Sequence, residues 1–357
     1  MCPNLGLIND YTFKKLSIPG VKGNRNMKTF AQSIIRICIN FTLTVVTLSC
    51  NLLPVAQAQD WPTKSLRLVI PFPPGGGSDV VGRIIAKQLS DVLRQQIVVD
   101  NRSGAGGSIG TEFVVRANPD GYTLLLGSTS EIAVNPNLYR LNYDTMNDLT
   151  PVGVVATSPI MIISAPGFAA KTIKELESLA RQKPGEINVA SAGNGTITHL
   201  SGELFKNINN LNWTHVPYKG TSPALADLMG GQVQLMFVTA PPVLGLIKSN
   251  KVNLIAVSGK SRMPDFPDTP TVLELGGKSY SVDNWYGVFV PSKTPNEVVQ
   301  KLSFALNQAL KTPELTTTLK AQGAEPGDMT VAQFVDYVKS ELDKWGAIIK
   351  AGNIKAD

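Results

Sequence analysis

Three glycine-rich loops hold the residues whose types and spacing could do chemistry in this sequence. Residues 73–79 read PPGGGSD, residues 103–110 read SGAGGSIG, and residues 191–199 read SAGNGTITH. Each loop follows an apolar, strand-like stretch and precedes a helix-like one. A helix N-terminus offers unpaired N–H groups, and glycine lets a ligand approach them closely. The arrangement therefore predicts a binding site for an anion.

The alternative is that a glycine-rich loop between a strand and a helix is only a tight turn. Three such loops in one chain favour the anion site, and a fourth loop, 127–131 (GSTSE), adds hydroxyl groups. We expect Asp79 mainly as an acid of a first helical turn and His199 as a polar wall or loop brace. The candidate ligand-binding residues of the loops are Gly75, Gly76, Gly77, Ser78, Asp79, Gly106, Gly107, Ser108, Ser128, Thr129, Ser191, Asn194, Thr196 and His199.

The composition of the loops indicates which anion they would hold. They contain no lysine or arginine, although Arg102 lies at the edge of one. The phosphate-binding pattern G-x-x-x-x-G-K-[ST] is absent, and Ile109 stands where G-x-G-x-x-G needs its last glycine. A carboxylate held by neutral donors therefore fits better than a nucleotide.

The sequence gives little support to catalysis, a metal or a cofactor. His199 and His215 are the only histidines and match no metal-binding motif. A serine nucleophile elbow, G-x-S-x-G, is absent. We therefore predict a protein that is not an enzyme, with no catalytic residue, metal or cofactor. Trp285 and Tyr286 are expected in the core, with a role at a cleft as the alternative.

The N-terminal stretch has the layout of a secretory signal. Met27 opens a mildly basic segment with Arg36, residues 37–56 carry no charge, and A-Q-A occupies 56–58. This pattern predicts a cleaved signal peptide and a periplasmic protein, with a transmembrane anchor as the competing interpretation. Residues 1–26 are interpreted as an upstream extension, with Met27 as the true start.

The number of cysteines and the net charge both change when residues 1–58 are left out. Cys2, Cys38 and Cys50 all lie in residues 1–58, and Thr47 makes lipidation at Cys50 unfavoured. The mature chain would therefore have no thiol for catalysis or metal binding. Residues 1–58 also carry six basic and one acidic residue, which leaves 27 basic and 26 acidic residues, a net charge of +1. The basic balance of the whole chain is thus no evidence for nucleic acid.

Strand-like and helix-like stretches alternate along the mature chain, which is typical of α/β proteins with mostly parallel sheets flanked by helices. The pattern restarts after residues 150–165, and 284–291 form a second long apolar strand. We predict two lobes joined by these two crossing strands, with a ligand cleft between them. The predicted parts are a leader at 1–58, lobe 1 at 59–155 and 290–357, and lobe 2 at 156–289.

Several segments together resemble one family over nearly the whole mature chain. They include RLVIPFPPGGGSDVVGRIIAKQL, VVDNRSGAGGSIG, NPDGYTLLLG, SAGNGTITHLSGELF, HVPYKGTSPALADLMGGQVQLMF and MPDFPDTPTVLELG. These resemble the Bug family, the TctC-type substrate-binding proteins of tripartite tricarboxylate transporters. The resemblance implies a periplasmic binding protein of the type II-like fold that closes on a small organic acid. It also implies that loops 73–79 and 103–110 hold one carboxylate and that loop 191–199 reaches it from the second lobe.

One departure from the family pattern bears on the ligand. Many relatives carry Asp where this chain has Gln234 and Val238, and alternation along the strand would turn Val238 toward the cleft. Val238 is therefore a further candidate ligand-binding residue. The missing acid argues against a ligand with an ammonium group.

We therefore expect a monomeric periplasmic receptor that captures a small carboxylate and delivers it to a two-component membrane permease of the tripartite tricarboxylate type. The first alternative is a periplasmic sensor that presents the same ligand to a signalling receptor. A periplasmic α/β hydrolase is the remote alternative, since it needs a nucleophile beside His199 or His215.

Overall fold

The computed structural model describes Phe30, Ser33, Cys38 and residues 61–276, 280 and 282–355. The chain divides into two units, Met1–Asp60 and Trp61–Asp357, and the second contains the elements discussed below. The predicted start at Met27, the cleavage site and Cys50 lie outside the described residues and stay predictions. Among the described helices, none has the length and apolar character needed to cross a membrane.

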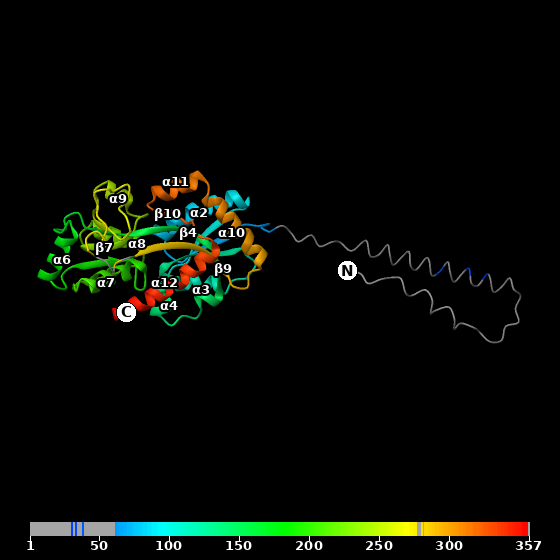
Figure 1. Ribbon diagram of the computed structural model, residues 1–357, viewed down its shortest axis with the longest axis horizontal. Coiled ribbons are helices and arrows are strands. Elements are labelled where there is room, and N and C mark those ends of the chain that lie inside the picture. Colours follow the sequence, from blue (N-terminus) through cyan, green and yellow to red (C-terminus); the bar gives the residue numbers. More distant parts are fainter. Residues whose placement is uncertain are drawn as a thin grey trace. The chain divides into compact units, whose positions relative to one another are not determined.

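Strands and helices alternate along the second unit (Figure 1). In chain order they are β1 (Leu66–Ile70), α2 (Gly77–Leu93), β2 (Ile97–Asn101), η1 (Ala105–Gly107), α3 (Ser108–Val115), β3 (Thr123–Ser128), η2 (Ser130–Val134), α4 (Asn135–Leu138), α5 (Thr145–Asp148), β4 (Leu149–Ser164), α6 (Ile173–Gln182), β5 (Asn188–Ser191), α7 (Ile197–Ile208), β6 (Thr214–Pro217), α8 (Thr221–Met229), β7 (Leu235–Thr239), α9 (Leu244–Lys248), β8 (Asn253–Val257), β9 (Asp283–Pro291), α10 (Asn296–Leu310), α11 (Pro313–Ala321), β10 (Glu325–Pro326) and α12 (Val331–Ala351).

The strands form one mixed sheet in the order β2-β1-β3-β9-β4-β7-β5-β6, with β8 and β10 paired to β4 outside this path. Strand β1 is parallel to β2 and β3, and β5 is parallel to β6 and β7. These parallel groups place the loops that follow β1, β3, β5 and β7 at carboxyl ends of strands, where ligands bind in such sheets. We call β1–β3, β9, β10 and their helices the first lobe, and β5–β8 with α6–α9 the second lobe.

Strand β4 links the two lobes because it belongs to both halves of the sheet. Its residues up to Pro159 pair with β9, and its residues from Ile160 on pair with β7 and β8. Strand β9 runs antiparallel to both β3 and β4 and pairs with β4 from Leu149 to Pro159. The predicted pair of long strands is present, while the lobe boundaries at 155, 156, 289 and 290 stay a prediction.

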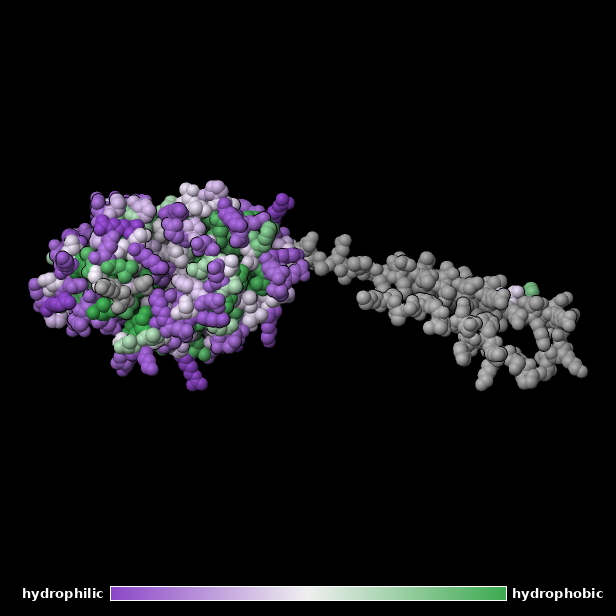
Figure 2. All heavy atoms as spheres, viewed as in Figure 1, coloured by the Kyte–Doolittle hydropathy of each residue, from purple (hydrophilic) through white to green (hydrophobic). Residues whose placement is uncertain are grey.

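The core is continuous across the lobes. One apolar cluster contains Val69, Leu125 and Trp285 of the first lobe together with Leu200 and Phe237 of the second. Helices α6–α9 cover one end of this unit in Figure 1, and α2, α3 and α10 cover the other. The face shown in Figure 2 is mainly hydrophilic, with apolar side chains in small groups. The predicted α/β class with two lobes is confirmed, because apolar strands are buried between layers of helices.

Candidate functional site

Three helix N-termini from the two lobes surround one cavity. The lining includes Gly76 and Gly77 where α2 begins, Thr196 and Ile197 where α7 begins, and Gly220 and Thr221 where α8 begins. The caps of α2 and α8 are glycines, so neither helix has a side chain that satisfies its first N–H groups. These groups and the helix dipoles make the cavity favourable for an anion.

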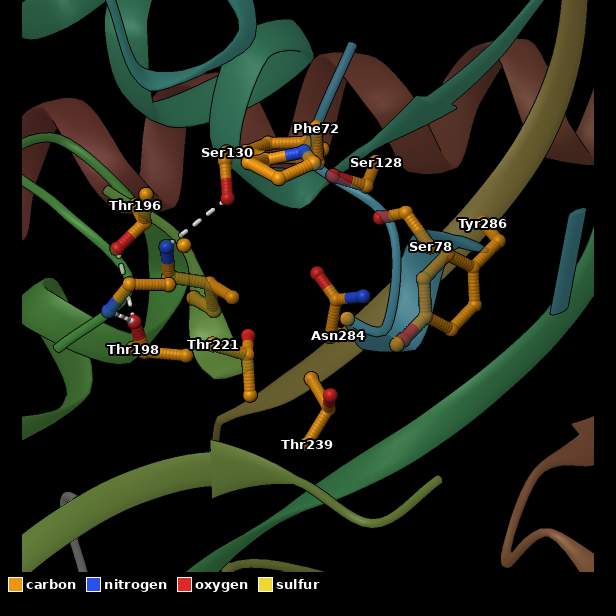
Figure 3. A pocket seen from close by; sticks show the side chains of 16 residues that line it. Phe72, Ser78, Ser128, Ser130, Thr196, Thr198, Thr221, Thr239, Asn284 and Tyr286 are labelled. Atoms are coloured by element: carbon orange, nitrogen blue, oxygen red, sulfur yellow. Dashed lines mark hydrogen bonds between the residues drawn. The ribbon is translucent and has the colours of Figure 1, made fainter. Parts of the chain in front are cut away.

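The cavity is lined by neutral groups. Threonines of α7 and α8 line one side, where the hydroxyls of Thr196 and Thr198 lie 2.8 Å apart (Figure 3). Ser78, Asn284 and Tyr286 lie on the opposite side (Figure 3). The hydroxyl and amide side chains of the lining are Ser78, Ser128, Ser130, Thr196, Thr198, Thr221, Thr239, Asn284 and Tyr286. Phe72, Pro73 and Ile197 add apolar walls. Such a site can bind a carboxylate through several hydrogen bonds without a counter-charge.

Two buried polar atoms of β9 converge on this space. Asn284 Oδ1 and the Tyr286 hydroxyl are buried, and neither has a partner with good hydrogen-bond geometry in the described chain, although the hydroxyl faces Thr239 and Asn284. Burial raises the pKa of Tyr286 to about 12, so its phenol is a neutral donor at ordinary pH. Buried polar groups normally have partners, so these two point to a polar ligand.

Gly77 is required by the close approach of these groups. A Cβ at residue 77 would lie 2.5 Å from the Tyr286 hydroxyl and still closer to Thr239 Oγ1. Any side chain here would therefore fill the space between α2, β7 and β9. Glycine is therefore needed at residue 77, where the loop after β1 leads into α2.

Asp79 braces the loop after β1 and does not line the cavity. Its carboxylate accepts hydrogen bonds from Gly75 N at 3.0 Å, Asn101 Nδ2 at 3.0 Å and Arg83 Nε at 3.1 Å. Burial raises the pKa of Asp79, but these hydrogen bonds outweigh burial and hold the pKa below its ordinary range. The negative charge is thus turned away from the cavity and fixed by Arg83.

The loop after β2 lies at the mouth of the cavity. A second pocket there shares Phe72, Pro73 and Thr196 with the cavity and also contains Gly106, Gly107 and Asn194. Gly106 approaches Asn194 closely, because a Cβ at residue 106 would lie 3.1 Å from the Asn194 carbonyl oxygen. The loops predicted from the two lobes therefore meet, as the sequence suggested, although 103–110 forms the rim and not the inner wall.

Other predicted residues lie behind the lining. Ser108 Oγ accepts from Asn135 Nδ2 at 3.1 Å, and Thr129 Oγ1 accepts from Trp285 N at 3.1 Å. Gly75 lies at the rim, where an added Cβ would meet Ser222 Oγ at 2.5 Å. These residues position the loops.

The two histidines brace loop 191–199. Their rings stack with centroids 4.0 Å apart, and His215 Nε2 lies 2.7 Å from Ser191 Oγ. This serine–histidine pair has the spacing of a nucleophile and its base. However, Ser191 is buried and does not line either of the two pockets described above, and its Oγ also accepts from Gly193 N at 3.1 Å.

Val238 lies in the core, contrary to the prediction that it faces the cleft. It packs in an apolar cluster with Met161 and Ala190, while the next residue, Thr239, lines the cavity. Gln234 also lies elsewhere, with Oε1 accepting from Asn188 N. All five residues of β7 are buried, so burial shows no alternation that could fix which of them face the cavity.

Sequence reasoning missed Ser130, Thr198, Thr221, Thr239 and Asn284 as lining residues. Ser130 lies in loop 127–131 and Thr198 in loop 191–199, so both predicted loops contribute more lining residues than expected. Thr221 follows a glycine before a helix, which is the same signal as in the other loops. Thr239 and Asn284 had no local signal, because their strands reach the cavity only through the sheet order.

The fold and the cavity define the class of two-lobed periplasmic binding proteins. The chain belongs to the TctC family, described as "Tripartite tricarboxylate transporter family receptor". The model of this family matches residues 81–354. It is 34% identical to the protein BugT of Bordetella pertussis, over 84% of this chain and 92% of BugT.

Two solved structures of proteins from Rhodopseudomonas palustris have the same fold as this chain, and each contains a bound organic acid. One, with adipate, has a TM-score of 0.80 and 35% identity, covering 83% of this chain and 99% of that one. The other, MatC with bound malate, has a TM-score of 0.77 and 30% identity, covering 81% of this chain and 100% of that one. The predicted resemblance to the Bug family is therefore confirmed.

Proposed function

We propose that this chain is a periplasmic receptor that captures a small organic carboxylate between its lobes and delivers it to a membrane permease of the tripartite tricarboxylate type. The observation that carries the proposal is the cavity itself. Three helix N-termini and nine neutral polar side chains surround it, and no charged side chain is among its lining residues. Adipate and malate in the related structures support the same ligand class.

The mechanism is closure driven by the ligand. A carboxylate docked on the N–H groups of α2 gains further hydrogen bonds from α7 and α8 only when the second lobe is close. This differential affinity shifts the population toward the closed form. We infer that a membrane partner recognises that form.

A thermal-melt screen tests the binding step. Mono-, di- and tricarboxylates, aromatic acids and amino acids are each added to the purified protein, after native mass spectrometry has checked for a retained ligand. A ligand at about 100 times its Kd should add roughly 2.7 kcal/mol of stability. Absence of a shift with every acid, in protein free of retained ligand, would refute the carboxylate site.

A matched pair of glycine variants locates the site. Gly77→Ala places a methyl group against Tyr286 and Thr239, whereas a Cβ at Gly167 has no atom within 4 Å. We expect Gly77→Ala to abolish the ligand-induced shift and Gly167→Ala to retain it, with both variants folded by circular dichroism. Equal binding by the two variants would place the ligand elsewhere.

An uptake assay tests the delivery step and separates it from sensing. Cells that lack this chain should lose uptake of the radiolabelled ligand if the receptor serves a permease. Intact uptake with a lost transcriptional response to the ligand would favour the sensor instead.

A further inference from the structure

A fully buried acid lies directly behind the cavity. Glu131 in η2 is 0% exposed and does not line the cavity, but both of its carboxyl oxygens contact Ser128, which does. Ser128 N–H lies 2.5 Å from Oε1, and Ser128 Oγ lies 2.8 Å from Oε2. Glu131 therefore contacts both the main chain and the hydroxyl group of a serine that lines the cavity.

The protonation state of Glu131 decides what that hydroxyl can offer. Oε1 accepts the N–H of Ser128, so the proton of a neutral carboxyl belongs on Oε2 and is donated to Ser128 Oγ. The serine proton is then free to point into the cavity. When the carboxyl is ionised, Ser128 must donate its proton to Oε2, and only oxygen lone pairs face the ligand.

We propose that Glu131 is a positioning residue for ligand binding, whose proton turns the Ser128 hydroxyl into a donor for the ligand's carboxylate. The inference rests on the proposed function, since it assumes that the cavity receives an anion. An ionised Glu131 would oppose capture twice, by reversing this hydrogen bond and by placing a second negative charge behind the ligand.

The surroundings of Glu131 favour its neutral form. Burial raises the pKa of Glu131 to about 8, although hydrogen bonds from its own main chain and from Ser128 oppose this. Among the described residues, the phenols of Tyr143 and Tyr286 interact with Glu131, and burial raises the pKa of each to about 12. On α12, which packs against η2, the buried acid Glu341 is paired with Lys344 at 2.9 Å.

Gly107 of the mouth loop explains how the acid is enclosed. A Cβ there would lie 3.0 Å from Glu131 Cβ and 3.0 Å from Phe72 Cζ, and Gly107 has a φ of +98°, which favours glycine. The loop thus packs directly onto the acid and contributes to its burial.

The decisive variant is Glu131→Gln, because the glutamine amide can accept from Ser128 N and donate to Ser128 Oγ as the neutral acid does. Calorimetry with adipate and malate is run from pH 7 to 9.5 in two buffers of different ionisation enthalpy. We expect the wild type to lose affinity, up to about tenfold per pH unit above its pKa, and to take up as much as one proton on binding. Glu131→Gln should show neither effect. Asp283→Asn is the control and should retain both, since burial raises the pKa of Asp283 only to about 6.

A titration of the ligand-free protein distinguishes failure of the Glu131 role from failure of the proposed receptor function. If the wild type binds with the same pH profile and proton uptake as Glu131→Gln, the positioning role is wrong while the receptor function stands. If neither adipate nor malate binds at any pH, these two acids are not ligands of the receptor, and the wider screen of acids decides the ligand class. The carboxyl ¹³C signal that Glu131→Gln removes then still decides the inference. Titration of that signal below pH 6 in the free protein overturns it, and titration near pH 8 supports it.

Discussion

Ser130 Oγ accepts a hydrogen bond from the main-chain N–H of Ile197 at 2.9 Å. The hydroxyl belongs to η2 of the first lobe, and the N–H belongs to the first residue of α7 in the second lobe. One orphan N–H of α7 is therefore satisfied only while the lobes are together. The bond stabilises the closed arrangement in which both residues line the cavity.

Ser130→Ala should weaken ligand binding by weakening closure. Loss of a hydrogen bond to a neutral group is worth about 0.5–1.5 kcal/mol, so we expect a roughly 3- to 10-fold higher Kd by calorimetry. Ser340→Ala is the control, because that hydroxyl donates to the Tyr337 carbonyl oxygen on the exposed face of α12. Unchanged affinity in Ser130→Ala would show that this bond is not part of the closing step.

Tyr286→Phe should lower affinity more strongly, because a buried phenol donates to an anion. A hydrogen bond to a charged group contributes about 1.5–3 kcal/mol, which predicts a 10- to 100-fold loss. Tyr280→Phe is a matched control, since its hydroxyl is also buried and does not line the cavity. Equal effects of the two variants on Kd would argue against a ligand contact at Tyr286.

Ligands with an ammonium group should bind poorly. An ammonium group in the cavity would meet no carboxylate among the lining residues and would lose its hydration. Succinate is therefore expected to bind at least about tenfold more tightly than aspartate, and glutarate more tightly than glutamate. Comparable Kd values within either pair would contradict this expectation, which now rests on the cavity lining and not on Gln234 or Val238.

The stability of the protein should depend on Glu131 between pH 6 and 8. The pKa of Glu131 rises from 4.5 to about 8 on folding, so the folded state holds a proton that the unfolded state has lost. This contribution is fully present below pH 4.5 and disappears as pH rises through 8. Urea unfolding should show a loss of about 2 kcal/mol from pH 6 to pH 8 in the wild type that is missing in Glu131→Gln. Parallel pH profiles for the two proteins would contradict the raised pKa.

The order of elements could be predicted because it depends on local patterns. The alternation of strand-like and helix-like stretches and the two long apolar strands were predicted, and the two strands correspond to β4 and β9. Short elements without such patterns, such as η2, α5 and β10, were not predicted. Strand β10, for example, is set by a tertiary contact, because Glu325 and Pro326 pair with Thr157 and Ala156 of β4.

The sequence alone determined that glycine-rich loops without lysine lead into helices, since these are properties of short segments, and it predicted an anion site there. It could not determine which side chains meet there. Asn284, Thr239 and Thr221 reach the cavity from β9, β7 and α8, which are adjacent only because β4 joins the two halves of the sheet. The burial of Glu131 was likewise not predictable from local sequence, because GSTSE resembles an ordinary polar loop. Glu131 becomes a buried acid only because Gly107 and Tyr143 pack around it. Local sequence sets backbone donors, but burial and convergence are decided by contacts between residues far apart in the chain.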